Sequence, residues 1–134
     1  MADRWKLLNE VKRITPNTLD ARACVPKDSI WFAGHFPGEP ILPGIALLHT
    51  VYEAILGDAR ARGESVKVSS LKRVRFTGPV LPGETLLLSL TREDGTEEIL
   101  FNFKILVKES IVCSGMIAVN NVIDKKVEKE DGNA

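Results

Sequence analysis

Alternating apolar and polar positions predict several extended segments along this chain. In residues 18–25, Leu19, Ala21 and Ala23 alternate with Asp20, Arg22 and Cys24, a pattern typical of a strand with one buried face. Asp94-Gly95, which separates two further runs of this kind, is a frequent hairpin turn. Turn residues bound the other runs, and we expect strands over residues 11–15, 18–25, 66–76, 84–93, 97–108 and 110–120.

Residues 44–57 follow a helical period instead. When they are placed about 100° apart around an axis, His49, Thr50 and Glu53 share one stripe about 100° wide. Every other position in this segment is apolar or small. Because a surface helix would carry a broad polar face, we expect a buried helix with a single polar stripe. Successive antiparallel strands with one buried helix predict an α+β fold, in which an antiparallel sheet is wrapped around a long central helix.

The length and the two ends of the chain fit one folded unit. A chain of 134 residues is long enough for one domain and too short for two sizeable cores, so we expect a single domain over residues 1–134. Near the start, Trp5, Leu7 and Leu8 lie among polar residues, which predicts a short amphipathic helix over about residues 1–10. Residues 121–134 are rich in charged side chains and are expected to form a polar C-terminal tail.

Composition and charge argue against several classes of protein. Eighteen basic and eighteen acidic residues give a formal net charge of zero, which argues against a nucleic-acid partner. No apolar run reaches the roughly 18 residues that a membrane span requires, and no secretory signal is visible. Cys24 and Cys113 lie far apart without metal-type spacing, and they suit buried thiols in a reducing compartment. We therefore expect a cytoplasmic protein.

Two histidines lie near the junction between a rigid loop and the predicted helix. His35 belongs to a loop over residues 34–44 that contains three glycines and three prolines. His49 lies on the polar stripe, one helical turn before Glu53. Burying titratable groups there costs roughly a few kcal/mol unless partners compensate, so the placement indicates a functional site. The alternative is structural: a histidine that stabilises a tight loop, and a hydrogen-bonded His–Glu pair in the core.

Gly44 follows Pro43 at the predicted start of the helix. Backbone N–H groups are unsatisfied there, the helix dipole is positive, and glycine lets a ligand approach the backbone closely. Such a terminus can bind the carbonyl oxygen of a thioester and stabilise an enolate. The alternative is an ordinary helix start, where proline is common.

Two segments resemble the signature motifs of the bacterial beta-hydroxyacyl–acyl carrier protein dehydratases. Residues 32–45, Phe-Ala-Gly-His-Phe-Pro-Gly-Glu-Pro-Ile-Leu-Pro-Gly-Ile, resemble the family's G-H-F-P-G-x-P-x-x-P-G motif ahead of a helix. Residues 74–84, Val-Arg-Phe-Thr-Gly-Pro-Val-Leu-Pro-Gly-Glu, resemble its second motif between strands. The resemblance spans about residues 11–120. It implies the hot-dog fold and the dehydration of a 3-hydroxyacyl thioester, carried on acyl carrier protein, to a trans-2-enoyl thioester. It implies no metal and no organic cofactor.

The same resemblance implies a role for each part of the site. The family histidine that matches His35 removes the C2 proton, and the glycine amide that matches Gly44 receives the thioester oxygen. A carboxylate on the central helix helps to protonate the departing hydroxyl, and it comes from the other subunit. We therefore expect a homodimer, alone or within a higher oligomer.

The chain departs from the family pattern at this helix carboxylate. Fourteen residues after His35 it carries His49, and Glu53 stands where the family commonly has glutamine. Three interpretations stay open. His49 donates the proton as an imidazolium, or Glu53 donates it from one turn away, about 5.4 Å. In the third, dehydration has been lost, which leaves a hot-dog thioesterase or a non-catalytic acyl-thioester-binding subunit. The ligand types of His35, His49 and Glu53 also permit a metal site, but the family chemistry needs no metal.

The implied carrier protein is acidic and presents its substrate on a long phosphopantetheine arm, so we expect a basic docking patch. Lys72, Arg73 and Arg75 are candidates, as are Arg60 and Arg62, and a solvated surface is the alternative for each of them. The candidates for lining the substrate tunnel are Phe36, Pro43, Ile45, Leu48 and Tyr52. Those on the helix suit the core equally well.

Overall fold

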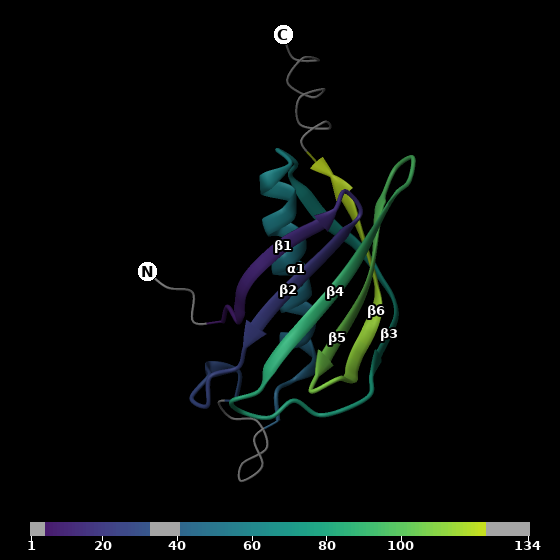
Figure 1. Ribbon diagram of the computed structural model, residues 1–134. Coiled ribbons are helices and arrows are strands. Elements are labelled where there is room, and N and C mark those ends of the chain that lie inside the picture. The colour runs from purple at the N-terminus through teal and green to yellow at the C-terminus, as the bar shows by residue number, and fades with distance from the viewer. Residues whose placement is uncertain (1–4, 33–40, 123–134) are drawn as a thin grey trace.

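The computed structural model describes residues 5–32 and 41–122, in which one sheet curls around one long helix (Figure 1). The helices are the 3-10 helix η1 (Ile30–Phe32) and the α-helix α1 (Gly44–Ala61). The strands are β1 (Leu8–Thr15), β2 (Thr18–Cys24), β3 (Val66–Phe76), β4 (Thr85–Asp94), β5 (Ile99–Val107) and β6 (Ser110–Asn121). This architecture confirms the predicted α+β fold with a sheet wrapped around a central helix.

Strand pairing is antiparallel throughout the sheet, in the order β1-β2-β4-β5-β6-β3. The predicted turn at Asp94-Gly95 joins β4 to β5, and Lys108-Glu109, with both residues at positive φ, joins β5 to β6. β3 has the bounds that the sequence predicts, and it pairs only with β6 among the described strands. It is therefore an edge strand with one unpaired side.

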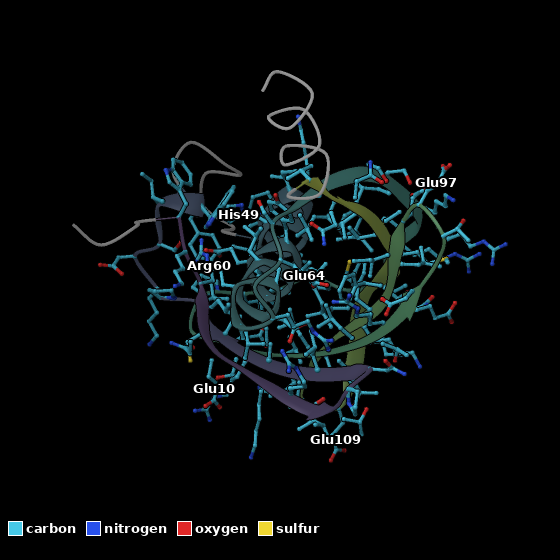
Figure 2. The ribbon with its side chains drawn as sticks, turned by 90° about the horizontal axis from the view of Figure 1, so that it is seen from above. Glu10, His49, Arg60, Glu64, Glu97 and Glu109 are labelled. Atoms are coloured by element: carbon cyan, nitrogen blue, oxygen red, sulfur yellow. The ribbon has the colours of Figure 1, made fainter. Side chains whose placement is uncertain are left out.

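The core lies between α1 and the concave face of the sheet. In the central strands every second residue is buried, as the alternating pattern predicts, and the opposite residues face outward. Figure 2 views the same arrangement from above, with the sheet curving around α1. The buried apolar residues of α1, β4 and β5 that form the middle of this core are Ala46, Leu47, Val51, Ala54, Ile55, Leu86, Leu88, Leu90, Phe101, Phe103 and Ile105.

The helix predicted near the N-terminus is wrong for the residues that the structure describes. Trp5 lies in a turn, and β1 already begins at Leu8. Leu8 pairs with Ala23 of β2, and Leu7 is buried in the core. An isolated helix of this length is marginal, so pairing with a neighbouring strand outweighs the local helical pattern. Residues 1–4 lie outside the described part of the chain.

Two expectations about the central helix need correction. It continues past Gly57 to Ala61, because Asp58 pairs with Arg62 one turn later and stabilises the last turn. It is also not enclosed on all sides within one chain. Thr50, placed on the polar stripe, is fully buried and donates to the carbonyl oxygen of Ala46 (2.8 Å), whereas Ile45 is 62% exposed. No helix in the described residues is long and apolar enough to cross a membrane.

A cluster of ion pairs fixes the C-terminal end of α1. The buried carboxylate of Asp58 accepts hydrogen bonds from Arg13 of β1 (2.8 and 3.0 Å) and from Arg62 (2.8 Å). Arg92 of β4 donates to both carboxylate oxygens of Glu64 (2.9 Å each). The hydrogen bond with Glu64 raises the pKa of Arg92 above its usual value, although burial opposes this shift. This cluster ties the helix end to two strands.

Candidate active site

The start of α1 is an open helix terminus packed against a phenylalanine. Pro43 precedes the helix in an extended conformation, no side chain caps the terminus, and the first turn carries no acidic residue. Its N–H groups are therefore without a side-chain acceptor among the described residues. A Cβ atom on Gly44 would lie 2.7 Å from Cε1 and Cζ of Phe76, so any larger residue here would require the Phe76 ring to move. Phe76 is the last residue of β3, which ends beside the start of α1.

His49 lies on the side of α1 that the sheet does not cover (Figure 2). Glu53, one helical turn later, pairs with it. His49 Nε2 lies 3.6 Å from Glu53 Oε1, an ion-pair distance that is too long for a good hydrogen bond. The side chain of His49 is 36% exposed and that of Glu53 only 13%. His49 Nε2 is buried and has no hydrogen-bond partner among the described residues. Because Nε2 faces a carboxylate oxygen at ion-pair distance, the contact fits both a functional imidazole and the structural His–Glu pair that the sequence leaves open.

A tryptophan of η1 lies against the same imidazole. The rings of Trp31 and His49 are 5.8 Å apart between centroids and inclined by 52°. Trp31 is held in turn by Trp5, whose ring it meets edge-on at 4.8 Å and whose carbonyl oxygen accepts a hydrogen bond from Trp31 Nε1 (2.7 Å). Trp31 and Glu53 thus approach His49 from different elements and restrict its rotation.

The structure describes only part of the predicted site. His35 and Phe36 lie in residues 33–40, outside the described part of the chain, so their roles remain predictions. Gly44 and His49 both belong to α1, but five residues of helix place them about 7.5 Å apart along the axis and about 140° apart around it. They therefore do not converge on one point within a single chain.

Of the predicted tunnel residues of α1, Ile45 and Tyr52 lie outside the core, whereas Leu48 packs against it. Ile45 is exposed, Tyr52 is half-buried outside the core cluster, and Leu48 is half-buried against it. Pro43 is half-buried at the helix start. The alternative that these helix residues fill the core is therefore wrong for Ile45 and Tyr52.

The candidate docking residues differ in availability. Lys72, Arg73 and Arg75 are exposed on β3. Arg62 donates to Asp58 and to the carbonyl oxygen of Pro16, so its charge is already neutralised. Arg60 is exposed near the opposite end of α1 from Gly44. The three β3 residues and Arg60 are therefore all exposed, and their role in docking stays a prediction.

Sequence reasoning missed Phe76 and Trp31. Phe76 lies inside the second motif. The available signal was Gly44: no turn requires a glycine at the start of the helix, so its presence indicates that another residue packs closely there. Trp31 directly precedes the first motif, but its contact with His49 joins η1 to α1, and local patterns do not reveal such a contact. Among the described residues, no three His, Cys, Asp or Glu side chains form a group that could hold a metal ion.

Comparison with known proteins extends this picture. The family model described as "ApeI-like: ApeI dehydratase" matches residues 11–116. A 3-hydroxyacyl-acyl-carrier-protein dehydratase, FabZ, of Ehrlichia chaffeensis is 34% identical over 87 residues, which cover 63% of this chain and 61% of that protein. The chain therefore spans less than two thirds of the length of that relative.

Two solved structures share the fold. An uncharacterized protein from Erwinia carotovora subsp. atroseptica is 30% identical, with a TM-score of 0.63 over 87% of this chain and 94% of that one. The dehydratase heterocomplex ApeI:P from Xenorhabdus doucetiae contains a chain that is 24% identical, with a TM-score of 0.64 over 87% of this chain and 98% of that chain. Together with the strand order, they confirm the hot-dog fold.

Proposed function

Because this chain belongs to the ApeI-like dehydratase family, we propose that it removes water from a 3-hydroxyacyl thioester to give a trans-2-enoyl thioester. The observation that carries the proposal is the combination of features on α1. The helix has an open N-terminus at Gly44, and its uncovered face holds the half-exposed imidazole of His49. A thioester elimination needs both an oxyanion site and a proton donor.

The proposed reaction uses three protein groups and no cofactor. His35 removes the proton from C2, and the N–H groups at Gly44 stabilise the negative charge that develops on the thioester oxygen. The electron pair then forms the C2–C3 double bond while the C3–O bond breaks. His49, as an imidazolium, gives its proton to the departing hydroxyl, which leaves as water.

We propose that two copies of the chain complete each site. Gly44 and His49 of one copy point about 140° apart, so a second copy has to supply one of the two groups. Two surfaces suit this pairing: the unpaired edge of β3 and the uncovered face of α1. The large apolar residues that these surfaces expose or half-expose are Ile45, Leu48, Tyr52, Val68, Leu71 and Phe76. A second copy would cover them and form a homodimer, which in turn can build a higher oligomer.

Within this scheme, Glu53 is a positioning residue rather than the proton donor. Its side chain is less exposed than that of His49, and it meets the buried edge of the imidazole. The opposite edge of the ring then faces the acyl chain. In this arrangement Ile45, Leu48 and Tyr52 line the substrate tunnel beside His49, together with Pro43 and the untested Phe36.

The substrate is delivered by an acidic acyl carrier protein in our proposal. Lys72, Arg73 and Arg75 are exposed on the strand that ends at Phe76, beside the start of α1, and would meet acidic side chains of that carrier. Binding should therefore weaken as salt is added. We also propose a cytoplasmic location. The prediction of a buried thiol is confirmed for Cys113 and wrong for Cys24, which is exposed, and an exposed free thiol suits a reducing compartment.

Hydration of a crotonyl thioester, the reverse reaction, tests the proposal directly. We expect loss of the enoyl absorbance with the native chain and at least a hundredfold lower kcat/KM for His35→Gln and for His49→Gln. The pH profile should be bell-shaped, because one imidazole must be neutral while the other is charged. A flat profile between about pH 5.5 and 8.5 would remove His49 as the acid.

A second candidate follows from His49 itself, which stands where the family has a carboxylate. The chain could then bind acyl thioesters without reacting, as one subunit of a mixed assembly; the Xenorhabdus neighbour is named a heterocomplex. The same assay separates the candidates. Binding without hydration favours the non-catalytic subunit, and release of free thiol would identify a thioesterase.

A further inference from the structure

A polar groove crosses the convex face of the sheet, on the opposite side from α1. It has a volume of about 400 Å³ and spans β3, β4, β5 and β6. Three cations line it: Arg73 and Arg75 from β3, and Lys104 from β5. Between them lie hydrogen-bonding side chains without charge, among them Ser89, Asn102 and Ser114. Within the part of the chain that the structure describes, no acidic residue lines this groove.

An irregularity in β3 turns both arginines toward the groove. Lys72 pairs with Met116 and Arg75 pairs with Ser114, so β3 contains one more residue than β6 between these two pairs, which is a β-bulge. A regular strand would place position 74 outward and position 75 inward, because side chains alternate between the faces. The extra residue reverses this phase: Val74 packs against the core, and Arg73 and Arg75 line the convex face.

The backbone at this irregularity is strained and tightly packed. Arg73 has φ 52°, in the left-handed region that non-glycine residues rarely adopt. A Cβ atom on Gly115 would lie 3.0 Å from Val74 Cα and 3.1 Å from Phe103 Cζ. The bulged strand therefore passes directly over this glycine. Strain of this kind persists where it serves a specific arrangement of side chains.

The three cations are not neutralised by their surroundings. No described residue forms an ion pair with Arg73, Arg75 or Lys104. The nearby acidic residues belong to the β4–β5 hairpin, where they line a separate groove with Lys72. Since the whole chain has no net charge, this groove is a local concentration of positive charge.

We propose that the groove binds a phosphate group, and that the phosphate belongs to the pantetheine arm of the thioester substrate. Guanidinium groups match phosphate oxygens with paired hydrogen bonds, and the hydroxyl and amide groups between the cations can donate further bonds. Arg75 is adjacent to Phe76, which packs on Gly44, so the groove reaches the same end of β3 as the start of α1, on the other face of the sheet. The inference of an anion site does not depend on the proposed function, whereas the identity of its ligand does. A free phosphorylated metabolite is the other source of the same chemistry.

Three probes separate these possibilities on the full chain. Inorganic phosphate reports the site itself, crotonyl-coenzyme A carries phosphate on the arm, and a crotonyl-N-acetylcysteamine thioester carries none. The test variant is Arg75→Gln/Lys104→Gln. The control is Lys67→Gln, which removes an exposed cation near the other end of β3, outside the groove.

We expect inorganic phosphate to shift the amide resonances around Gly115 in the native chain and in the control, but not in the test variant. We also expect KM for crotonyl-coenzyme A, relative to KM for the phosphate-free thioester, to rise about tenfold in the test variant and not in the control. Absence of phosphate-dependent shifts would overturn the anion site. Shifts without a change in the KM ratio would overturn the assignment to the arm and favour a free metabolite. If neither thioester is turned over while the shifts persist, the proposed function fails and the anion site stands.

Discussion

Replacing Asp58 with alanine tests how α1 is held in the sheet. The carboxylate is only 3% exposed and pairs with Arg13 and Arg62, both at 2.8 Å, with Arg92 at 4.0 Å. The substitution leaves these guanidinium groups without their shared acceptor. Removing one partner of a buried ion pair usually costs about 3–5 kcal/mol, because the remaining charge stays uncompensated.

The expected cost for Asp58→Ala lies near the lower end of that range. The side chains of Arg13 and Arg62 are 38% and 20% exposed, so both can regain water. Arg92 is only 6% exposed but keeps its two hydrogen bonds to Glu64. We therefore expect a loss of about 3 kcal/mol, equivalent to a fall in Tm of about 10 °C. Asp58→Asn, which retains one acceptor oxygen, should lose less.

Urea unfolding of the native chain and the Asp58 variants measures these losses. Asp20→Ala removes an exposed carboxylate that has no ion pair among the described residues, and it should change stability by less than about 0.5 kcal/mol. Because Asp58 lies about 21 Å along the helix from Gly44, kcat/KM of the folded variant should stay close to the native value. A loss no larger than that of Asp20→Ala would refute the argument that this cluster fixes α1.

Three further predictions concern the candidate site. Gly44→Ala forces the ring of Phe76 aside and should lower kcat/KM at least tenfold. The double variant Gly44→Ala/Phe76→Leu should recover part of the lost kcat/KM. An unchanged kcat/KM in the single variant contradicts the packing argument. His49→Glu places a second carboxylate beside Glu53, and the two negative charges repel each other. In urea unfolding this variant should be about 1 kcal/mol less stable than the double variant His49→Glu/Glu53→Gln. Equal stabilities would show that the side chains at positions 49 and 53 do not interact. Trp31→Leu should lower kcat in the hydration assay while Trp31→Phe, which keeps a ring against His49, lowers it less; equal losses would deny the ring a positioning role.

Local patterns were sufficient for most of the fold, because strands and helix each bury one face against a shared core. The extended run of residues 66–76 between turn signals predicts β3 with its observed bounds, and the period of residues 44–57 predicts most of α1. The errors have long-range causes. Pairing of Leu8 with Ala23 decides the conformation of the N-terminal segment, and burial of Thr50 depends on the sheet that packs against it.

The candidate site was predictable in part for the same reason. His49 and Glu53 share a helix, so their spacing alone predicts their proximity, and the structure confirms it. Phe76 and Trp31 reach the site from β3 and η1, and only the tertiary fold brings them there. Convergence of Gly44 with the imidazoles needs a second copy of the chain, which no pattern within one sequence can position.

The unequal attachment of the two ends of α1 has a consequence for how relatives of this protein diversify. Ion pairs immobilise the C-terminal turn, whereas the first turn contacts the sheet through Phe76 and exposes Ile45. Substitutions at Ile45 can therefore reshape the space offered to an acyl chain without disturbing the charged cluster on which folding depends. Selection for a new acyl-chain length would act on the N-terminal end of α1, and the ion pairs at its C-terminal end would preserve the fold.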